Sequence, residues 1–143
     1  MALALLVTLE KDLPDAAPAA TYQKSGTGKA LARELEKLDF AARCKAVAQP
    51  SSLLSESQAA LIEQLRADGF DPSKMRLPPE QFYPAADGLS VVRALHEYVT
   101  AKLNDFKQPN PILRDLKAAE ALLLAADAAG VRFHFTKADL HKT

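Results

Sequence analysis

A lysine preceded by two glycines lies near the start of the chain, in the segment "KSGTGKAL" at residues 24–31. Phosphate-binding loops of the Walker A type read Gly-x-x-x-x-Gly-Lys-Ser/Thr and follow a strand directly. Here Gln23 stands where the first glycine belongs, and Ala30 stands where a hydroxyl would ligate magnesium. The segment therefore predicts a turn that begins a helix, although the first amides of that helix can still hold an anion weakly.

Metal and nucleophile chemistry has little support in the sequence. The histidines are His96, His134 and His141, and no pair has the spacing of a helical metal site. Cys44 is the single cysteine, so it has no disulfide partner within the chain. We expect it to be a small buried apolar residue. A G-x-S-x-G motif is absent, so we predict no metal, no cofactor and no catalytic residue, although a triad assembled only by folding stays open.

The best candidate for a binding site is the end of a Pro-rich connection at residues 70–83, together with the helix after it. Aromatic side chains beside an arginine are typical of the centres of protein–protein interfaces. The large apolar residues of the connection, which include Phe70 and Met75, predict that it packs on the body. The alternative to a binding site is that Phe82 and Tyr83 only attach this connection to the core. The predicted binding site comprises Phe82, Tyr83, Arg93 and His96.

Two short strands are predicted at the ends of the chain. Residues 2–9 form an apolar run closed by charged residues, which is typical of a buried strand. Residues 131–136, "VRFHFT", alternate between apolar and polar side chains, which predicts one buried face and one solvent face. His134 belongs to the predicted solvent face. Strands at the two ends suggest that the ends pair, and such a ribbon needs helices over one face.

Apolar residues at helical spacing predict about four helices between these strands. The short link at Pro109 predicts that the last two helices form an antiparallel hairpin. We therefore expect a helix-dominated α+β fold in one globular domain, residues 1–143, with the helices packed on a small sheet that pairs the N- and C-terminal strands. The helices are expected to begin near Lys29, Ser55, Pro84 and Asn110.

Composition excludes further classes of protein. Lys and Arg together number 18, as do Asp and Glu, so the 143-residue chain has no formal net charge to attract nucleic acid or an anionic membrane. The apolar N-terminal run follows no positive charge and is too short to span a bilayer. A single cysteine suits a reducing compartment. We predict a cytoplasmic protein with no nucleic-acid partner and no membrane partner.

Three segments of the chain are "GKALARELEKLDFAA", "FYPAADGLSVVRALHEYV" and "AAGVRFHF". Together they resemble short uncharacterised bacterial cytosolic proteins. The resemblance implies a bacterial cytosolic protein with no assigned activity, and it transfers no catalytic residue.

These observations favour a noncatalytic protein-interaction or accessory module, which binds a protein partner or a second copy of itself. A terminal strand with a free edge would offer one surface for such pairing. The alternative is a small enzyme or ligand-binding protein, whose site would lie between the 70–83 connection and the predicted helix at residues 84–106.

Overall fold

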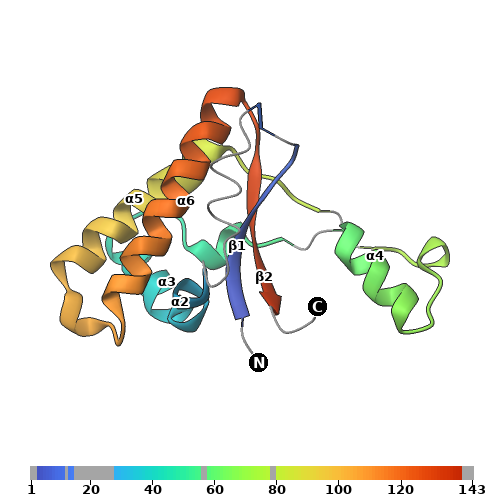
Figure 1. Ribbon diagram of the computed structural model, residues 1–143, viewed down its shortest axis with the longest axis horizontal. Coiled ribbons are helices and arrows are strands. Elements are labelled where there is room, and N and C mark those ends of the chain that lie inside the picture. Colours follow the sequence, from blue (N-terminus) through green and yellow to red (C-terminus); the bar gives the residue numbers. More distant parts are fainter. Residues whose placement is uncertain (1–2, 12, 15–27, 56–57, 78–79, 140–143) are drawn as a thin grey trace.

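The two ends of the chain form one antiparallel sheet (Figure 1). The computed structural model describes residues 3–11, 13–14, 28–55, 58–77 and 80–139. In the sheet, β1 (Leu3–Leu9) pairs with β2 (Phe133–Asp139), and the register runs from Leu3 opposite Asp139 to Leu9 opposite Phe133. The pairing of N- and C-terminal strands in a helix-dominated α+β fold is therefore confirmed.

The helices follow the predicted order, with one difference near the start. The helix expected from Lys29 onward is divided at Glu34, whose backbone leaves the helical region with φ −118°. The last two helices lie side by side as the predicted antiparallel hairpin (Figure 1). The α-helices are α2 (Lys29–Arg33), α3 (Leu35–Cys44), α4 (Gln58–Ala67), α5 (Ala85–Ala101) and α6 (Pro109–Ala129). Single 3-10 turns are η1 (Pro50–Leu53), η2 (Pro72–Lys74) and η3 (Leu103–Asp105).

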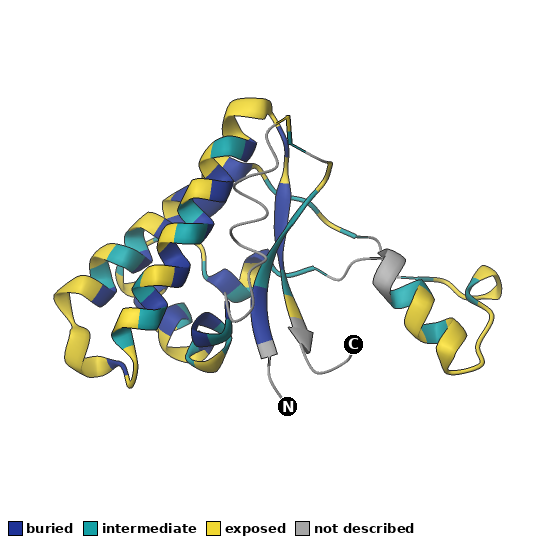
Figure 2. Cartoon of the chain, viewed as in Figure 1, coloured by how far each residue is buried: buried dark blue, intermediate teal, exposed yellow. Residues whose placement is uncertain are grey.

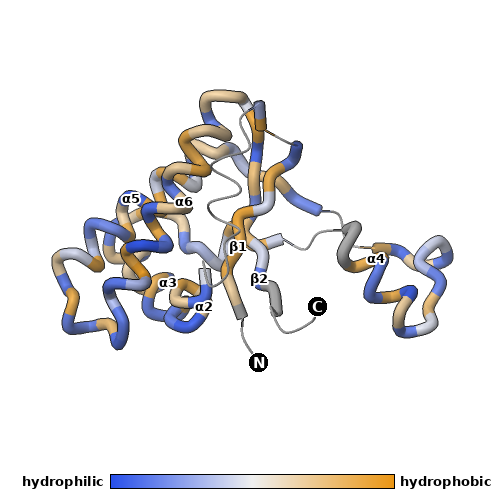
Figure 3. The backbone as a smooth tube through the Cα atoms, viewed as in Figure 1, coloured by the Kyte–Doolittle hydropathy of each residue, from blue (hydrophilic) through white to orange (hydrophobic). Residues whose placement is uncertain are grey.

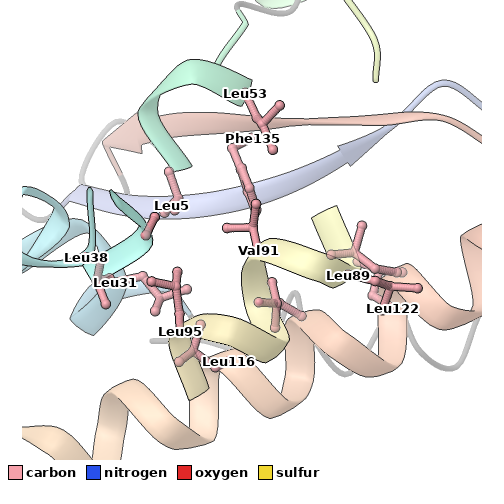
Figure 4. Close-up of a cluster of buried hydrophobic side chains, with 14 of the residues drawn as sticks. Leu5, Leu31, Leu38, Leu53, Leu89, Val91, Leu95, Leu116, Leu122 and Phe135 are labelled. Atoms are coloured by element: carbon pink, nitrogen blue, oxygen red, sulfur yellow. The ribbon is translucent and has the colours of Figure 1, made fainter. Parts of the chain in front are cut away.

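The core lies between one face of the sheet and helices α2, α3, α5 and α6. Figure 4 shows Leu5 of β1 and Phe135 of β2 directed toward this core, with Val91 of α5 below Phe135. Each such side chain contributes about 1.5–3 kcal/mol when it is fully buried. The predicted apolar stripes of the helices supply most of these residues, although Leu103, which lies within the predicted helix at residues 84–106, is 43% exposed at η3.

Two predictions about the surface are wrong. Cys44 is exposed rather than buried, because it is the last residue of α3 and lies off the face that packs on the core. The 70–83 connection does not pack on the body along its whole length, since Phe70 is 56% exposed and Met75 is 43% exposed. No described helix combines the length and apolar character needed to cross a membrane.

Candidate functional site

An arm at residues 58–77, formed by α4 and η2, projects from the rest of the molecule (Figures 1 and 2). Between Leu61 and Leu77 no residue is buried. Figure 3 shows apolar residues of the arm interspersed with hydrophilic ones. A helix as short as α4, with 10 residues, is marginal in water when nothing packs on it. The arm therefore has the properties of a segment that is covered on binding.

The apolar side chains of the arm come from both of its halves. Leu61, Ile62 and Leu65 of α4 are partly exposed, and Phe70 and Met75 follow the helix. The acidic and basic side chains of the arm are equal in number, so the arm has no net charge that would repel a second copy of itself. The acids are Glu63, Asp68 and Asp71, and the bases are Arg66, Lys74 and Arg76.

The residues that flank the arm on both sides, which form its base, lie at the outer edge of β2. The Ser55 N–H donates to the Phe135 carbonyl at 3.0 Å, and Tyr83 exchanges two backbone hydrogen bonds with Phe133 at 2.7 and 2.9 Å. The Ser55 hydroxyl also accepts from the Gln81 N–H at 2.9 Å, so the two ends are joined to each other. The strand edge that we expected to be free for pairing is therefore occupied at positions 133 and 135.

A buried histidine holds the base of the arm against the sheet. The His134 Nε2 lies 2.6 Å from Glu80 Oε2, and Nδ1 lies 3.1 Å from Thr136 Oγ1. Thr136 Oγ1 is in turn 2.8 Å from Thr8 Oγ1. The Nε2–H donates to Glu80, and Nδ1 lies 3.1 Å from both the Thr136 hydroxyl and the Phe135 carbonyl oxygen. The chain of hydrogen bonds thus links the arm to both strands.

The expected position of His134 on the solvent face is wrong. Its alternation is as predicted, since it points away from the helices, but residues 80–82 cover that face and leave the ring fully buried. The Phe82 ring lies 5.0 Å from the imidazole, measured between centroids. Since both ring nitrogens are engaged and the ring is shielded from solvent, His134 positions the arm.

The structure divides the four predicted binding residues into two pairs. Phe82 and Tyr83 lie at the base of the arm, against β2. Arg93 and His96 lie about 12 and 16 Å along α5 from its first residue. Arg93 forms an exposed ion pair with Glu120 of α6 at 3.2 Å. The Phe82 ring instead meets His134 of β2, and the Tyr83 hydroxyl donates to Gln81 Oε1 at 3.3 Å.

The last glycine of the glycine-rich segment, Gly28, binds a carboxylate of the protein itself, that of Asp115. The Gly28 N–H donates to Asp115 Oδ2 at 2.9 Å, and the Gly28 carbonyl accepts from the Leu5 N–H at 2.9 Å. Asp115 is 1% exposed, and its Oδ1 has no hydrogen-bond partner among the residues that the structure describes. Burial raises the pKa of Asp115, and the bond from Gly28 opposes that shift. Residues 24–27 of the predicted motif lie outside the described residues.

Asp115 was missed because its type suggested a solvent-exposed position. Its spacing carried a signal, since it follows Ile112 by three residues and precedes Ala119 by four, within the buried stripe of α6. A carboxylate in such a stripe needs a donor, and the amide at the start of α2 supplies one. The Gly28 amide, at the helix start that could have held an external anion, therefore donates to a carboxylate of the protein itself.

Two cavities in the described part of the chain lie away from the arm. The larger, about 590 Å³, is bounded by α2, α3, Ser51, residues 107–108 and Lys137. The smaller, about 380 Å³, is lined by aromatic residues that include Phe40 and Tyr98. Within the described ranges, no group of three His, Cys, Asp or Glu side chains is arranged to hold a metal ion.

Comparison of the chain with protein-family models, with curated proteins and with solved structures gives no match. A function can therefore be inferred only from the molecule's own geometry. The projecting arm and its fixed base are the features of that geometry that a core does not require.

Proposed function

We propose that this protein is a noncatalytic protein-interaction module that associates with a second copy of itself through the arm. The observation that carries the proposal is the lack of any buried residue from Leu61 to Leu77, in a segment with six large apolar side chains. An isolated arm of this kind gains little from folding, whereas an arm covered by a partner gains the burial of those side chains.

The exposed apolar side chains of the arm favour association. Complete burial of a Leu, Phe or Met side chain contributes about 1.5–3 kcal/mol. The side chains already half-buried contribute less than that, and the lost freedom of two molecules opposes the total. Phe70 at 56% exposure and Met75 at 43% exposure therefore contribute the largest share.

A second copy is the occupant that the sequence of the arm suits. Leu61 and Leu65 lie one helical turn apart, so antiparallel pairing of two α4 helices sets Leu61 of each copy opposite Leu65 of the second copy. Such a two-fold contact is self-complementary. Neither the arm, with three acids and three bases, nor the whole chain, with zero net charge, repels its copy.

The base of the arm supports this role. The hydrogen bonds of Ser55, Tyr83 and His134 fix both ends of the arm on β2, so a contact made by the arm is held in a defined orientation to the body. Fixing the ends also lowers the entropy that the arm loses when it docks.

Light scattering coupled to size exclusion tests the proposal with a matched pair of variants. In Phe70→Ser/Met75→Ser, two arm side chains that are 56% and 43% exposed are replaced. In Phe40→Ser/Leu103→Ser, two side chains that are 52% and 43% exposed, both outside the arm, are replaced. We expect a dimer for the unmodified chain at roughly 100 µM, a monomer for the arm variant and a dimer for the control.

Neither variant alters a core residue, so both should retain the circular dichroism spectrum and cooperative unfolding of the unmodified chain. A monomeric unmodified chain at that concentration contradicts the proposal. Dissociation of the Phe40→Ser/Leu103→Ser variant alone also contradicts it, and would place the interface at the aromatic cavity that Phe40 lines.

A further inference from the structure

The cavity beside α2 and α3 has the size of a small-molecule site. Its volume of about 590 Å³ falls in the range of roughly 300–1,000 Å³ that such sites occupy. Its wall includes the apolar side chains of Ala30, Ala32 and Leu35, and its rim is strongly charged. What those charges already contact decides which ligand the cavity suits.

Two of the three acids in the lining are engaged by the protein. Glu34 Oε1 accepts from the Lys37 Nζ at 3.5 Å and from the Lys107 backbone N–H at 3.1 Å. Asp39 Oδ1 accepts from the Ser51 backbone N–H at 3.1 Å. These carboxylates therefore hold α3 against its neighbours, and Glu36 is the acid of the lining that remains without a contact in the described part of the chain.

The bases of the lining are less engaged. Lys37 is engaged by Glu34 and by the Asp105 carbonyl, which its Nζ meets at 2.9 Å. Among the described residues, the hydrogen bond of the Arg33 side chain goes to a neutral group, the Gln108 amide oxygen, at 2.9 Å. The ammonium groups of Lys107 and Lys137 have no hydrogen bond or ion pair within the described ranges. With Lys37 paired to Glu34, three bases face the two remaining acids, Glu36 and Asp39, so the lining carries an excess of one positive charge.

The direction of Lys137 follows from the sheet. Side chains alternate along a strand, so Lys137 lies on the same face of β2 as the buried Phe133 and Phe135. That face is the one that the helices cover, and Lys137 also lines the cavity. A lysine at the end of the core face, with no carboxylate opposite it in the described residues, is placed to meet a ligand.

We infer that this cavity binds a small organic anion that carries a doubly charged group, such as a phosphate ester, on an apolar body. The charged group meets Lys107, Lys137 and Arg33, and the apolar body lies against Ala30 and Leu35. The site is separate from the arm, so the inference does not depend on the proposed self-association.

Phenyl phosphate is a suitable probe, because it joins a dianion to an apolar ring. In a titration followed by amide chemical shifts, we expect millimolar or tighter binding, with shifts at residues 30–37 and 107–108. Lys107→Gln/Lys137→Gln should weaken binding at least about tenfold at fixed ionic strength. Lys117→Gln, which removes an exposed lysine beside Glu120 on α6 and outside the cavity, should leave the affinity unchanged.

Three results would overturn the inference. The first is no saturable shift with phenyl phosphate at millimolar concentration. The second is an equal loss of affinity in the Lys117→Gln control, which would indicate a general charge effect. The third is equal affinity for inorganic phosphate, which would show that the apolar wall does not contribute.

Discussion

Replacement of Gly28 by alanine should destabilise the fold more than the same change at any exposed left-handed glycine. The φ of Gly28 is +89°, a conformation that costs alanine about 1–2 kcal/mol. A Cβ at this position would lie 2.4 Å from the Leu5 carbonyl oxygen, more than an ångström inside an ordinary contact of about 3.5 Å. Because β1 is paired along its whole length and Leu5 is 2% exposed, the strand cannot yield freely.

Relief of that contact has to separate Gly28 from its partners. The bonds that are lost or stretched are Gly28 N–H to Asp115 and Leu5 N–H to Gly28, both 2.9 Å. Each contributes about 1 kcal/mol, so the two together add about 2 kcal/mol to the cost of the backbone conformation. The expected loss in the free energy of unfolding is about 3–4 kcal/mol.

Gly130→Ala is the matched control. Gly130 has φ +69°, and a Cβ there would meet no atom within 4 Å, so only the backbone cost of about 1–2 kcal/mol applies. Urea unfolding followed by circular dichroism measures both variants. If the two variants differ by less than about 0.5 kcal/mol, the close approach of Gly28 to β1 and Asp115 does not stabilise the fold as argued.

Two further substitutions test the core. Burial raises the pKa of Asp115 above 3.8, so the folded state holds the proton of this carboxyl more tightly than the unfolded state. As the pH rises through the raised pKa, the unmodified chain should therefore lose stability relative to the Asp115→Asn variant. Urea unfolding of both proteins from about pH 3.5 to about pH 8 checks this, and a constant difference contradicts it. Gly88→Ala would place a Cβ 2.5 Å from the Phe133 ring, so it should lower the melting temperature, with a loss of about 1–2 kcal/mol. An exposed helical glycine would instead be stabilised by alanine, and that result would refute the contact.

Much of the fold could be predicted because its signals are local. The alternation of residues 131–136 and the helical spacing of Leu35, Leu38 and Ala42 each fix a buried face within one segment. The pairing of the two ends followed because a lone apolar strand needs a partner. These expectations depend on neighbours in the sequence, and the structure confirms them.

Features that depend on distant residues could not be predicted. His134 is buried because Glu80 and Phe82, more than 50 positions earlier, cover its face of the sheet. The Oδ2 atom of Asp115 accepts from the Gly28 N–H, which lies 87 positions away. In both cases a polar residue type indicated solvent exposure, and only the topology supplies the partner that makes burial possible.

In the arm, apolar residues that were expected to be buried are exposed. Phe70 and Met75 were expected to pack on the body because large apolar residues usually do. In the structure they project on the arm, where no other described part of the chain buries them. Apolar composition alone does not distinguish a side chain buried within one molecule from a side chain that needs a second one.

Hydrogen exchange measured at several protein concentrations tests the proposed association most directly. Peptides that span Leu61–Leu77 report on the arm, and peptides from α6 report on the body of the same molecule. Association through the arm predicts that amides of Leu61–Leu77 exchange more slowly as concentration rises, while amides of α6 exchange at a constant rate. Exchange in the arm that is fast and independent of concentration would contradict the account.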